Sequence, residues 1–480
     1  MTGTAAVGVQ EASSYAGYGA RMDKFKLQDS PCGEPVLDAA EGEPRQTSAK
    51  PAFAVDHDTV MENGKAPWWE VASHLVTAMF GAGVLGLPYA IASCGWVLGL
   101  LMLTLATATS CYSAFLLAEM HTLRSGRRVR TLRGLAEEVF GKLGRKIVLS
   151  LQMVDLVGGA LIFTVAGGTS LMDIVNGCYG AKGLECDAHE YRTWPWSVAF
   201  GIAMMFPDFH ALSVVSLVGS TMPLLYSSIA FVSILVKGPV AGASHAMITK
   251  GGAFETTMNV FSGIGSFAYA FGGQVVQNEV TAMLHTPPPV MVSMRKAITL
   301  TYAMLAAGYF GVGIAGFAVF GNTVTGNILQ SIPYEVPAYI ANVGVLLHVA
   351  AAYQVFSMTV YTAIEEQLTD RKLLPRQLAA RPWLLRLSVR TTYVCLITFL
   401  AALIPFFNQL SGLKGGACMV PLCFILPILM WTCYNSHEAS TPRKVLNWGL
   451  ISLFSALALV ATVGSVYKIV KNASTFQLFA

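Results

Sequence analysis

Long apolar segments alternate with short polar ones along most of the chain. A bilayer-spanning helix needs about 20 predominantly apolar residues. Windows of that kind fall near residues 69–91, 95–120, 146–175, 195–212, 214–236, 256–280, 297–320, 337–363, 389–407, 410–433 and 446–469. The fourth and fifth windows are separated only by FPDFHALS at 206–213. The pattern predicts an all-α polytopic membrane protein with eleven transmembrane helices.

The composition agrees with this pattern. Of the 480 residues, 54% are hydrophobic and only 12% are charged, whereas a soluble domain is about 25% charged. Residues 1–66 differ, because they are polar, mixed in charge and without a long apolar run. We expect a disordered cytosolic tail at 1–66, a membrane domain at 67–470 and a short external tail at 471–480.

Lysine and arginine give the orientation. With the N-terminus inside, 24 of the 31 basic residues fall in inner segments. The seven outer ones are Lys182, Arg192, Lys237, Lys250, Lys414, Lys468 and Lys471. Because basic residues collect on the cytosolic side, this bias predicts a cytosolic N-terminus and an external C-terminus.

The nine cysteines contain no CxxC pair, so no zinc or other metal site is expected. Cys178 and Cys186 lie in the predicted external segment 177–195. An oxidising exterior permits a disulfide between them, with two free thiols as the alternative.

The first apolar window is interrupted by FGAGVLGLPYAI at 80–91. Close packing between helices favours small residues and would explain Gly81, Gly83 and Gly86. It would not explain Pro88, which follows soon after them. Unpaired backbone in hydrocarbon is costly, so an unwound stretch survives only where it lines a cavity. A break at Gly81–Gly83 would aim the first N–H groups of a second half-helix at an anion.

The sixth window carries a second interruption, SGIGSFAYAFGGQVVQNEV at 262–280. Interrupted helices at matching places in two halves point to a transporter site. Windows one and six begin two halves of five spans each, with one span left over. An odd number of spans inverts the second half relative to the first. A substrate would then bind at the midplane between the two breaks.

Five motifs carry a family resemblance: GAGVLGLPYAIASCGW (81–96), GGTSLMDIV (167–175), GIGSFAYAFGGQ (263–274), FAVFGNTVTGNIL (317–329) and LLHVAAAYQVFSMTVYTAIE (346–365). In this order, from about Trp68 to Tyr434, the chain resembles the amino acid/auxin permease family, and its plant lysine/histidine transporter-like branch most. The resemblance implies a proton-coupled amino-acid importer with alternating access. It also implies a LeuT-like 5+5 inverted repeat plus one extra helix, in the plasma membrane or, alternatively, the vacuolar membrane.

The resemblance also implies roles for residues at both breaks. Backbone N–H groups would bind the substrate carboxylate, carbonyls would receive its ammonium group, and two aromatic rings would shape the side-chain pocket. The donors are Gly81, Ala82, Gly83 and Val84; the carbonyls are those near Phe80 and at Ser266, Phe267 and Ala268; the rings are Tyr269 and Phe271. Relatives often place a Gly-His pair just after the FAYA motif, whereas this chain has Phe271-Gly272-Gly273-Gln274 there.

Coupling to a proton requires an ionisable group within the membrane. The candidates are Asp155, mid-window in LQMVDLVGGALI, Glu279 after the second break, and His348 beside three alanines. Sodium is the second choice as coupling ion. Ser357 and Thr359 would hold it together with carbonyls around Ala78 and Gly81.

Other functions remain as alternatives. The carrier could move auxin or another small carboxylate, or the protein could sense amino acids and signal through residues 1–66. A P-loop, an HExxH motif and a nucleophile elbow are all missing from the sequence, so we expect no enzyme and no cofactor. The expected partners are an amino acid and the lipid bilayer, without nucleic acid, and the oligomeric state is left open.

Overall fold

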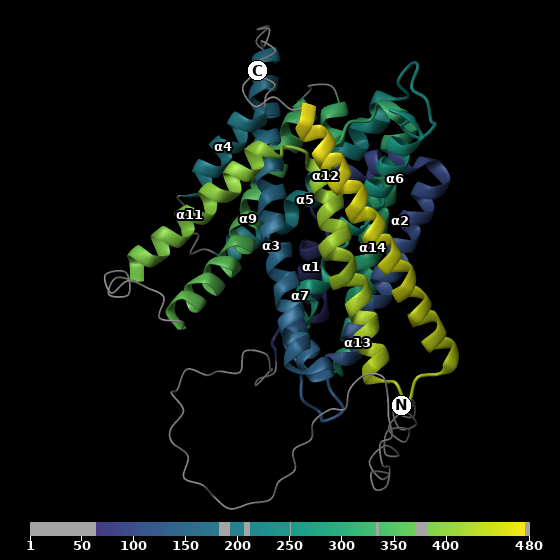
Figure 1. Cartoon of the computed structure of the whole chain (residues 1–480), viewed down its shortest axis with the longest axis vertical. Coiled ribbons are helices and arrows are strands. Elements are labelled where there is room, and N and C mark those ends of the chain that lie inside the picture. The colour runs from purple at the N-terminus through teal and green to yellow at the C-terminus, as the bar shows by residue number, and fades with distance from the viewer. Residues whose placement is uncertain are drawn as a thin grey trace, which may run out of the picture. The chain divides into compact units, whose positions relative to one another are not determined.

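The structure of the protein is a computed structural model (Figure 1). It describes residues 64–181, 193–205, 212–249, 251–332, 336–370 and 382–475. These residues belong to one compact unit, Arg45–Ala480. Their regular structure is helical apart from two isolated β-bridges, Ala66 with Leu284 and Thr122 with Arg128.

The elements follow one another as short and long helices. They are α1 (Trp68–Met79), the 3-10 helix η1 (Ala82–Gly86), α2 (Leu87–Met120), α3 (Leu132–Ala181), α4 (Thr193–Met204), α5 (Leu212–Lys237), α6 (Gly252–Tyr269), α7 (Gln274–Ala282), α8 (Val290–Phe320), the 3-10 helices η3 (Gly321–Thr323) and η4 (Ile328–Ser331), α9 (Val336–Asp370), α11 (Pro382–Leu403), α12 (Phe407–Lys414), the π-helix η5 (Gly415–Ile425), α13 (Leu426–Tyr434) and α14 (Thr441–Thr475).

Among the described residues, seven helical stretches are long and apolar enough to cross a membrane. They are Ala82–Met120, Leu132–Val175, Val290–Thr323, Val336–Thr369, Trp383–Leu403, Phe407–Tyr434 and Thr441–Ser474. A shorter apolar stretch, Thr221–Lys237, lies in α5. The expected window at 195–212 corresponds to α4, which has only 12 residues. An all-α membrane architecture is therefore confirmed, whereas eleven long helices are not seen as such.

A glycine kink stands where the first and second apolar windows meet. No loop separates them, because α2 continues from Leu87 to Met120. Within it, Gly95 has φ 76 and ψ 172. A positive φ strains residues that carry a Cβ, so glycine permits this turn. The two predicted spans are therefore two helical segments that meet at Gly95 without an intervening loop.

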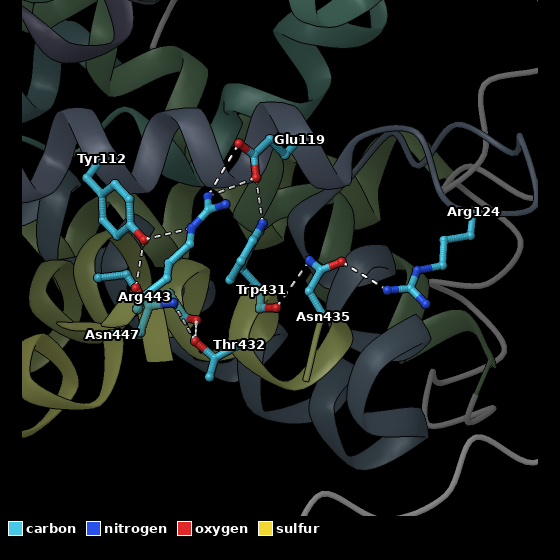
Figure 2. Close-up of polar contacts among 9 residues, drawn as sticks. Tyr112, Glu119, Arg124, Trp431, Thr432, Asn435, Arg443 and Asn447 are labelled. Carbon is cyan, nitrogen blue, oxygen red and sulfur yellow. Dashed lines mark hydrogen bonds and ion pairs between the residues drawn. The ribbon is translucent and has the colours of Figure 1, made fainter. Parts of the chain in front are cut away.

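A polar network joins the ends of α2, α13 and α14 (Figure 2). Glu119 accepts a hydrogen bond from Nε1 of Trp431 at 2.7 Å and one from the Arg443 guanidinium at 3.1 Å. That guanidinium also lies 3.7 Å from the centroid of the Trp431 ring. Next to it, Asn447 accepts a hydrogen bond from the Tyr112 hydroxyl at 2.7 Å. These contacts fasten the start of α14 to the end of α2.

Helix α6 packs against α12 and η5 through glycines. A Cβ placed on Gly265 would collide with the carbonyl of Gly412, and one on Gly415 would collide with the carbonyl of Gly265. Small residues of this kind let helix backbones approach closely in a membrane. The contact holds the element that carries the second predicted break.

We expect Gly265→Ala to lower the melting temperature, because the added methyl group collides with backbone that cannot move aside. Overpacking of this kind costs about 1–3 kcal/mol. Thermal unfolding of the detergent-solubilised protein measures the effect. Gly449→Ala in α14 is the control, since a Cβ there meets nothing within 4 Å. Equal melting temperatures for the two variants would contradict the close backbone contact.

Candidate functional site

The first predicted interruption is confirmed. Helix α1 ends at Met79, Phe80 and Gly81 leave the helical conformation, and η1 begins at Ala82. Gly81 is extended, with φ −127 and ψ −163. The N–H of Val84 already donates to the Gly81 carbonyl at 3.3 Å. The N–H groups of Gly81, Ala82 and Gly83 are therefore the best-placed donors for an anion.

The second interruption lies within the predicted stretch 262–280, at its second pair of glycines. Helix α6 ends at Tyr269 and α7 begins at Gln274, so the break falls at 270–273 and the carbonyls at 266–268 belong to the last turn of α6. The Gly272-Gly273 pair marks this break, whereas Gly265 serves helix packing. The last carbonyls of a helix lack α-helical partners. Here the Phe267 and Ala268 carbonyls accept from the N–H groups of Ala270 and Phe271 at 3.3 and 3.1 Å, so each has one further lone pair for another donor. The predicted acceptors thus lie at the negative end of α6.

The two breaks touch each other inside the protein. A Cβ on Gly83 would lie 3.0 Å from the Cα of Ala270, and one on Gly273 would collide with the Met79 side chain. Both Phe80 and Phe271 are buried. The start of η1, with its donor groups, therefore lies beside the end of α6, with its acceptor groups. Such an arrangement suits a ligand that carries both a negative and a positive group.

Tyr309 of α8 connects the two breaks and is itself fully buried. Its hydroxyl oxygen lies 2.6 Å from the Met79 carbonyl and 2.7 Å from the Ala270 carbonyl. A hydroxyl has one proton, so the two carbonyls share a single donor. The rings of Phe80 and Phe271 pack on Tyr309 with centroid distances of 5.3 and 5.1 Å. Tyr309 lies outside all five family motifs, so it could not be chosen from the sequence.

His348 of α9 lies at the first break. A Cβ on Gly81 would stand 3.6 Å from its Nε2, and its ring lies 6.0 Å from the ring of Tyr226 on α5. Both His348 and Tyr226 are buried. The structure therefore brings one of the three predicted coupling residues to the edge of the candidate substrate site.

Asp155 of α3 forms an ion pair with Lys414 at 2.9 Å, and the two side chains are 3% and 6% exposed. The expectation that Lys414 lies outside the membrane was wrong. Helices α12, η5 and α13 follow one another without a gap, which places Lys414 inside the apolar stretch Phe407–Tyr434. Its Nζ lies 5.3 Å from the centroid of the Tyr269 ring at the end of α6. The pairing could not be predicted, because Asp155 and Lys414 lie far apart in the sequence.

The remaining predicted residues do not gather at the breaks. Glu279 is exposed on α7. Ser357 is buried, but Thr359 is exposed and donates to the Val355 carbonyl of its own helix, so the two hydroxyls do not converge on a cation. The disulfide predicted between Cys178 and Cys186 falls outside the described residues.

We expect Tyr309→Phe to destabilise the protein, because it leaves the Met79 and Ala270 carbonyls without this donor. An unpartnered buried polar group costs about 1–3 kcal/mol. Thermal unfolding measures the loss. Tyr467→Phe on α14, where the ring packs only edge-on against Phe254 at 5.2 Å, is the matched control. If the two variants unfold at the same temperature, Tyr309 does not fasten the breaks.

Comparison with known proteins finds a matching family model and plant relatives. The family model described as transmembrane amino acid transporter protein matches residues 64–471. Lysine histidine transporter-like 1 of Arabidopsis thaliana is 30% identical, over 88% of this chain and 92% of its own length. Amino acid permease 2 of the same plant is 27% identical, over 90% and 93%.

Among solved structures, one titled MhsT in complex with L-phenylalanine aligns with 12% identity, over 84% of this chain and 100% of that one. Its TM-score is 0.49, a likeness too small to establish a shared fold. The family match and the plant relatives, in contrast, cover nearly the whole described chain. The chain therefore belongs to the amino acid/auxin permease family of transmembrane amino acid transporters, as an integral membrane protein similar to the plant lysine/histidine transporter-like branch.

Proposed function

We propose that this protein is a secondary active importer that carries amino acids together with protons by alternating access. The observation that carries the proposal is the contact between two buried helix breaks, at Gly81–Gly83 and at 270–273. The N–H groups of Gly81, Ala82 and Gly83 bind the substrate carboxylate. The last carbonyls of α6, at 266–268, receive its ammonium group.

The aromatic residues divide into two roles in this proposal. Phe80 and Phe271 are buried against Tyr309, so they hold the shape of the site. Tyr269 is partly exposed at the end of α6 and is free to contact the substrate side chain. Gln274, the first residue of α7, donates to the Ser110 hydroxyl at 2.6 Å. It therefore anchors α7 to α2 and not the substrate.

The arrangement of the helices supports a 5+5 inverted repeat plus one helix. The first half comprises α1 with η1 and the start of α2, the rest of α2 beyond Gly95, and then α3, α4 and α5. The second half comprises α6 with α7, then α8, α9, α11 and the α12–η5–α13 unit, with α14 as the extra helix. These make eleven crossings. Each half then begins with its broken helix, as expected for a midplane site.

The proposed orientation has the N-terminus in the cytosol, the C-terminus outside and the plasma membrane as location. Moving Lys414 from the outer segments into the interior strengthens the positive-inside bias. Import is the proposed direction, because an inward electrochemical gradient of protons across the plasma membrane would drive the substrate inward.

A proton is the proposed coupling ion. An amino acid zwitterion carries no net charge, so the membrane potential acts only on an accompanying cation. One such charge gains about 2.3 kcal/mol per 100 mV. Asp155 and His348 are buried, as a coupling group requires, while Glu279 is exposed. The sodium alternative lacks convergent hydroxyls because Thr359 is exposed.

Radiolabelled uptake in amino-acid-transport-deficient yeast tests the proposal. We expect uptake of amino acids to rise at acid external pH and to be unaffected by sodium. The labelled compounds tested include auxin as well as amino acids. If auxin is taken up and no amino acid is, the proposed substrate is wrong and auxin takes its place. A chain lacking residues 1–60 is assayed beside the full chain, because a pure transporter keeps its uptake. If neither auxin nor any amino acid enters, the transporter proposal is wrong.

We expect Gly81→Ala to reduce amino acid uptake by roughly tenfold or more, because the added methyl group keeps the substrate carboxylate from reaching the N–H groups. Loss of one hydrogen bond to a charged group costs about 1.5–3 kcal/mol. The extended φ of Gly81 suits alanine, and the methyl group meets His348 at an ordinary 3.6 Å. Folding should therefore persist while the carboxylate site is obstructed. Gly311→Ala in α8 also meets only ordinary contacts, 3.5 Å from Phe231, and serves as control. Normal uptake by Gly81→Ala at normal surface levels would place the carboxylate elsewhere.

A further inference from the structure

We propose that Asp155 and Lys414 together form the proton-binding pair of the transport cycle. In this inference Asp155 takes up and releases one proton, and Lys414 is the positioning residue that transmits the change to α6. The inference rests on the proposed proton symport and names the group that performs it. Lys414 has no role in the sequence motifs that identify the family.

The ion pair is unusual in its burial. The Nζ of Lys414 lies 2.9 Å from Oδ1 of Asp155, and both side chains are almost wholly enclosed. By contrast, the Arg124–Glu438 pair is about half to two-thirds exposed. A buried pair is weak evidence for stability, because apolar residues of similar size often replace one without loss. Its presence here therefore invites a functional explanation.

The pair lies against the end of the second broken helix. Lys414 Nζ stands 5.3 Å from the centroid of the Tyr269 ring and 5.8 Å from that of Phe356 on α9. Lys414 is also the last residue of α12, directly before the π-helix η5. A movement of the Lys414 side chain would therefore change its contact with Tyr269, the last residue of α6.

The backbone carries the same connection. Two residues before Lys414, the Gly412 carbonyl touches Gly265 of α6, and directly after it Gly415 touches the Gly265 carbonyl. Glycine contacts this close leave no space for one helix to shift without the other. A shift of the α12–η5 segment around Lys414 would therefore also displace α6, which carries the proposed substrate carbonyls.

The groups around the pair leave Asp155 as its proton acceptor. Among the residues that the structure describes, the titratable groups that face Asp155 are the Tyr269 phenol from α6 and the thiols of Cys418 and Cys423 from η5. Phenols and thiols are neutral at ordinary pH. On α3 itself, Gly158 and Gly159 lie along the Lys414 stem and add no charge. A proton arriving here thus meets one carboxylate.

The charge balance suits symport of a neutral zwitterion. Without the proton, the Asp155 carboxylate and the Lys414 ammonium sum to zero. A proton from outside binds the carboxylate, the ion pair opens, and Lys414 keeps its charge, so the pair carries +1. Release of the proton to the cytosol restores the closed pair. One net charge therefore crosses with each substrate, which is what the membrane potential can act on.

The test uses the full chain, purified and reconstituted in liposomes, with a labelled substrate identified by the uptake panel. Two readouts are recorded: accumulation driven by an inward pH gradient, and exchange of labelled for unlabelled substrate without a gradient. Asp155→Asn, Lys414→Met and the double variant are compared with the intact chain. Glu255→Gln is the control, since Glu255 of α6 pairs with Lys471 of α14 away from this site.

The intact chain and the Glu255→Gln control should accumulate substrate about tenfold per unit of pH gradient, the limit for one coupled proton. The double variant removes both charges together and avoids a lone buried ion. We expect it to exchange substrate but to lose pH-driven accumulation. Continued tenfold accumulation by the double variant overturns the inference, and so does loss of exchange and accumulation together, which indicates a structural pair. If the intact chain exchanges substrate but does not respond to pH, proton symport itself fails.

Discussion

The structure depends on one constraint: inside a bilayer, no backbone N–H or carbonyl can turn to water. Two helices nevertheless come apart, at Phe80–Gly81 and at 270–273. They are able to do so because each break lies against the other, with Gly83 beside Ala270. The Tyr309 hydroxyl serves a carbonyl from each side. Since it has one proton for two carbonyls, an acceptor is left over for a second donor such as a substrate ammonium group.

The glycines near the second break have two different roles. Gly265 lies at a helix–helix contact, whereas Gly272 and Gly273 lie in the break itself. Gly265 permits backbone contact with Gly412, so its helix continues unbroken to Tyr269. Gly272 and Gly273 then open the chain, close to Met419 of η5 and Met79 of α1 respectively. Counting glycines along the sequence could not separate packing glycines from hinge glycines, because that depends on what each one faces. The predicted carbonyls consequently fall in a helical turn and not in the gap.

Apolar windows, the first break and the family motifs could be predicted from sequence because each is a local property of the chain. The family was identified from such motifs and is confirmed. Tyr309 and Lys414 were missed because their importance comes from partners 230 and 259 positions away. Lys414 was also misplaced, since a lone lysine near a window edge resembles a loop residue until an acid on another helix neutralises it.

The interior thus holds two electrostatically different sites, the pair of helix breaks and the Asp155–Lys414 ion pair. Backbone dipoles at the two breaks suit a zwitterion, whose opposite charges need donors and acceptors but no net countercharge. A separate buried ion pair at Asp155 and Lys414 suits a single proton, whose arrival changes the net charge by one. Neither ligand then competes for the groups of the other. In the proposed mechanism the two sites communicate through α6, because Tyr269, which lies next to Lys414, directly follows the carbonyls proposed to bind the substrate.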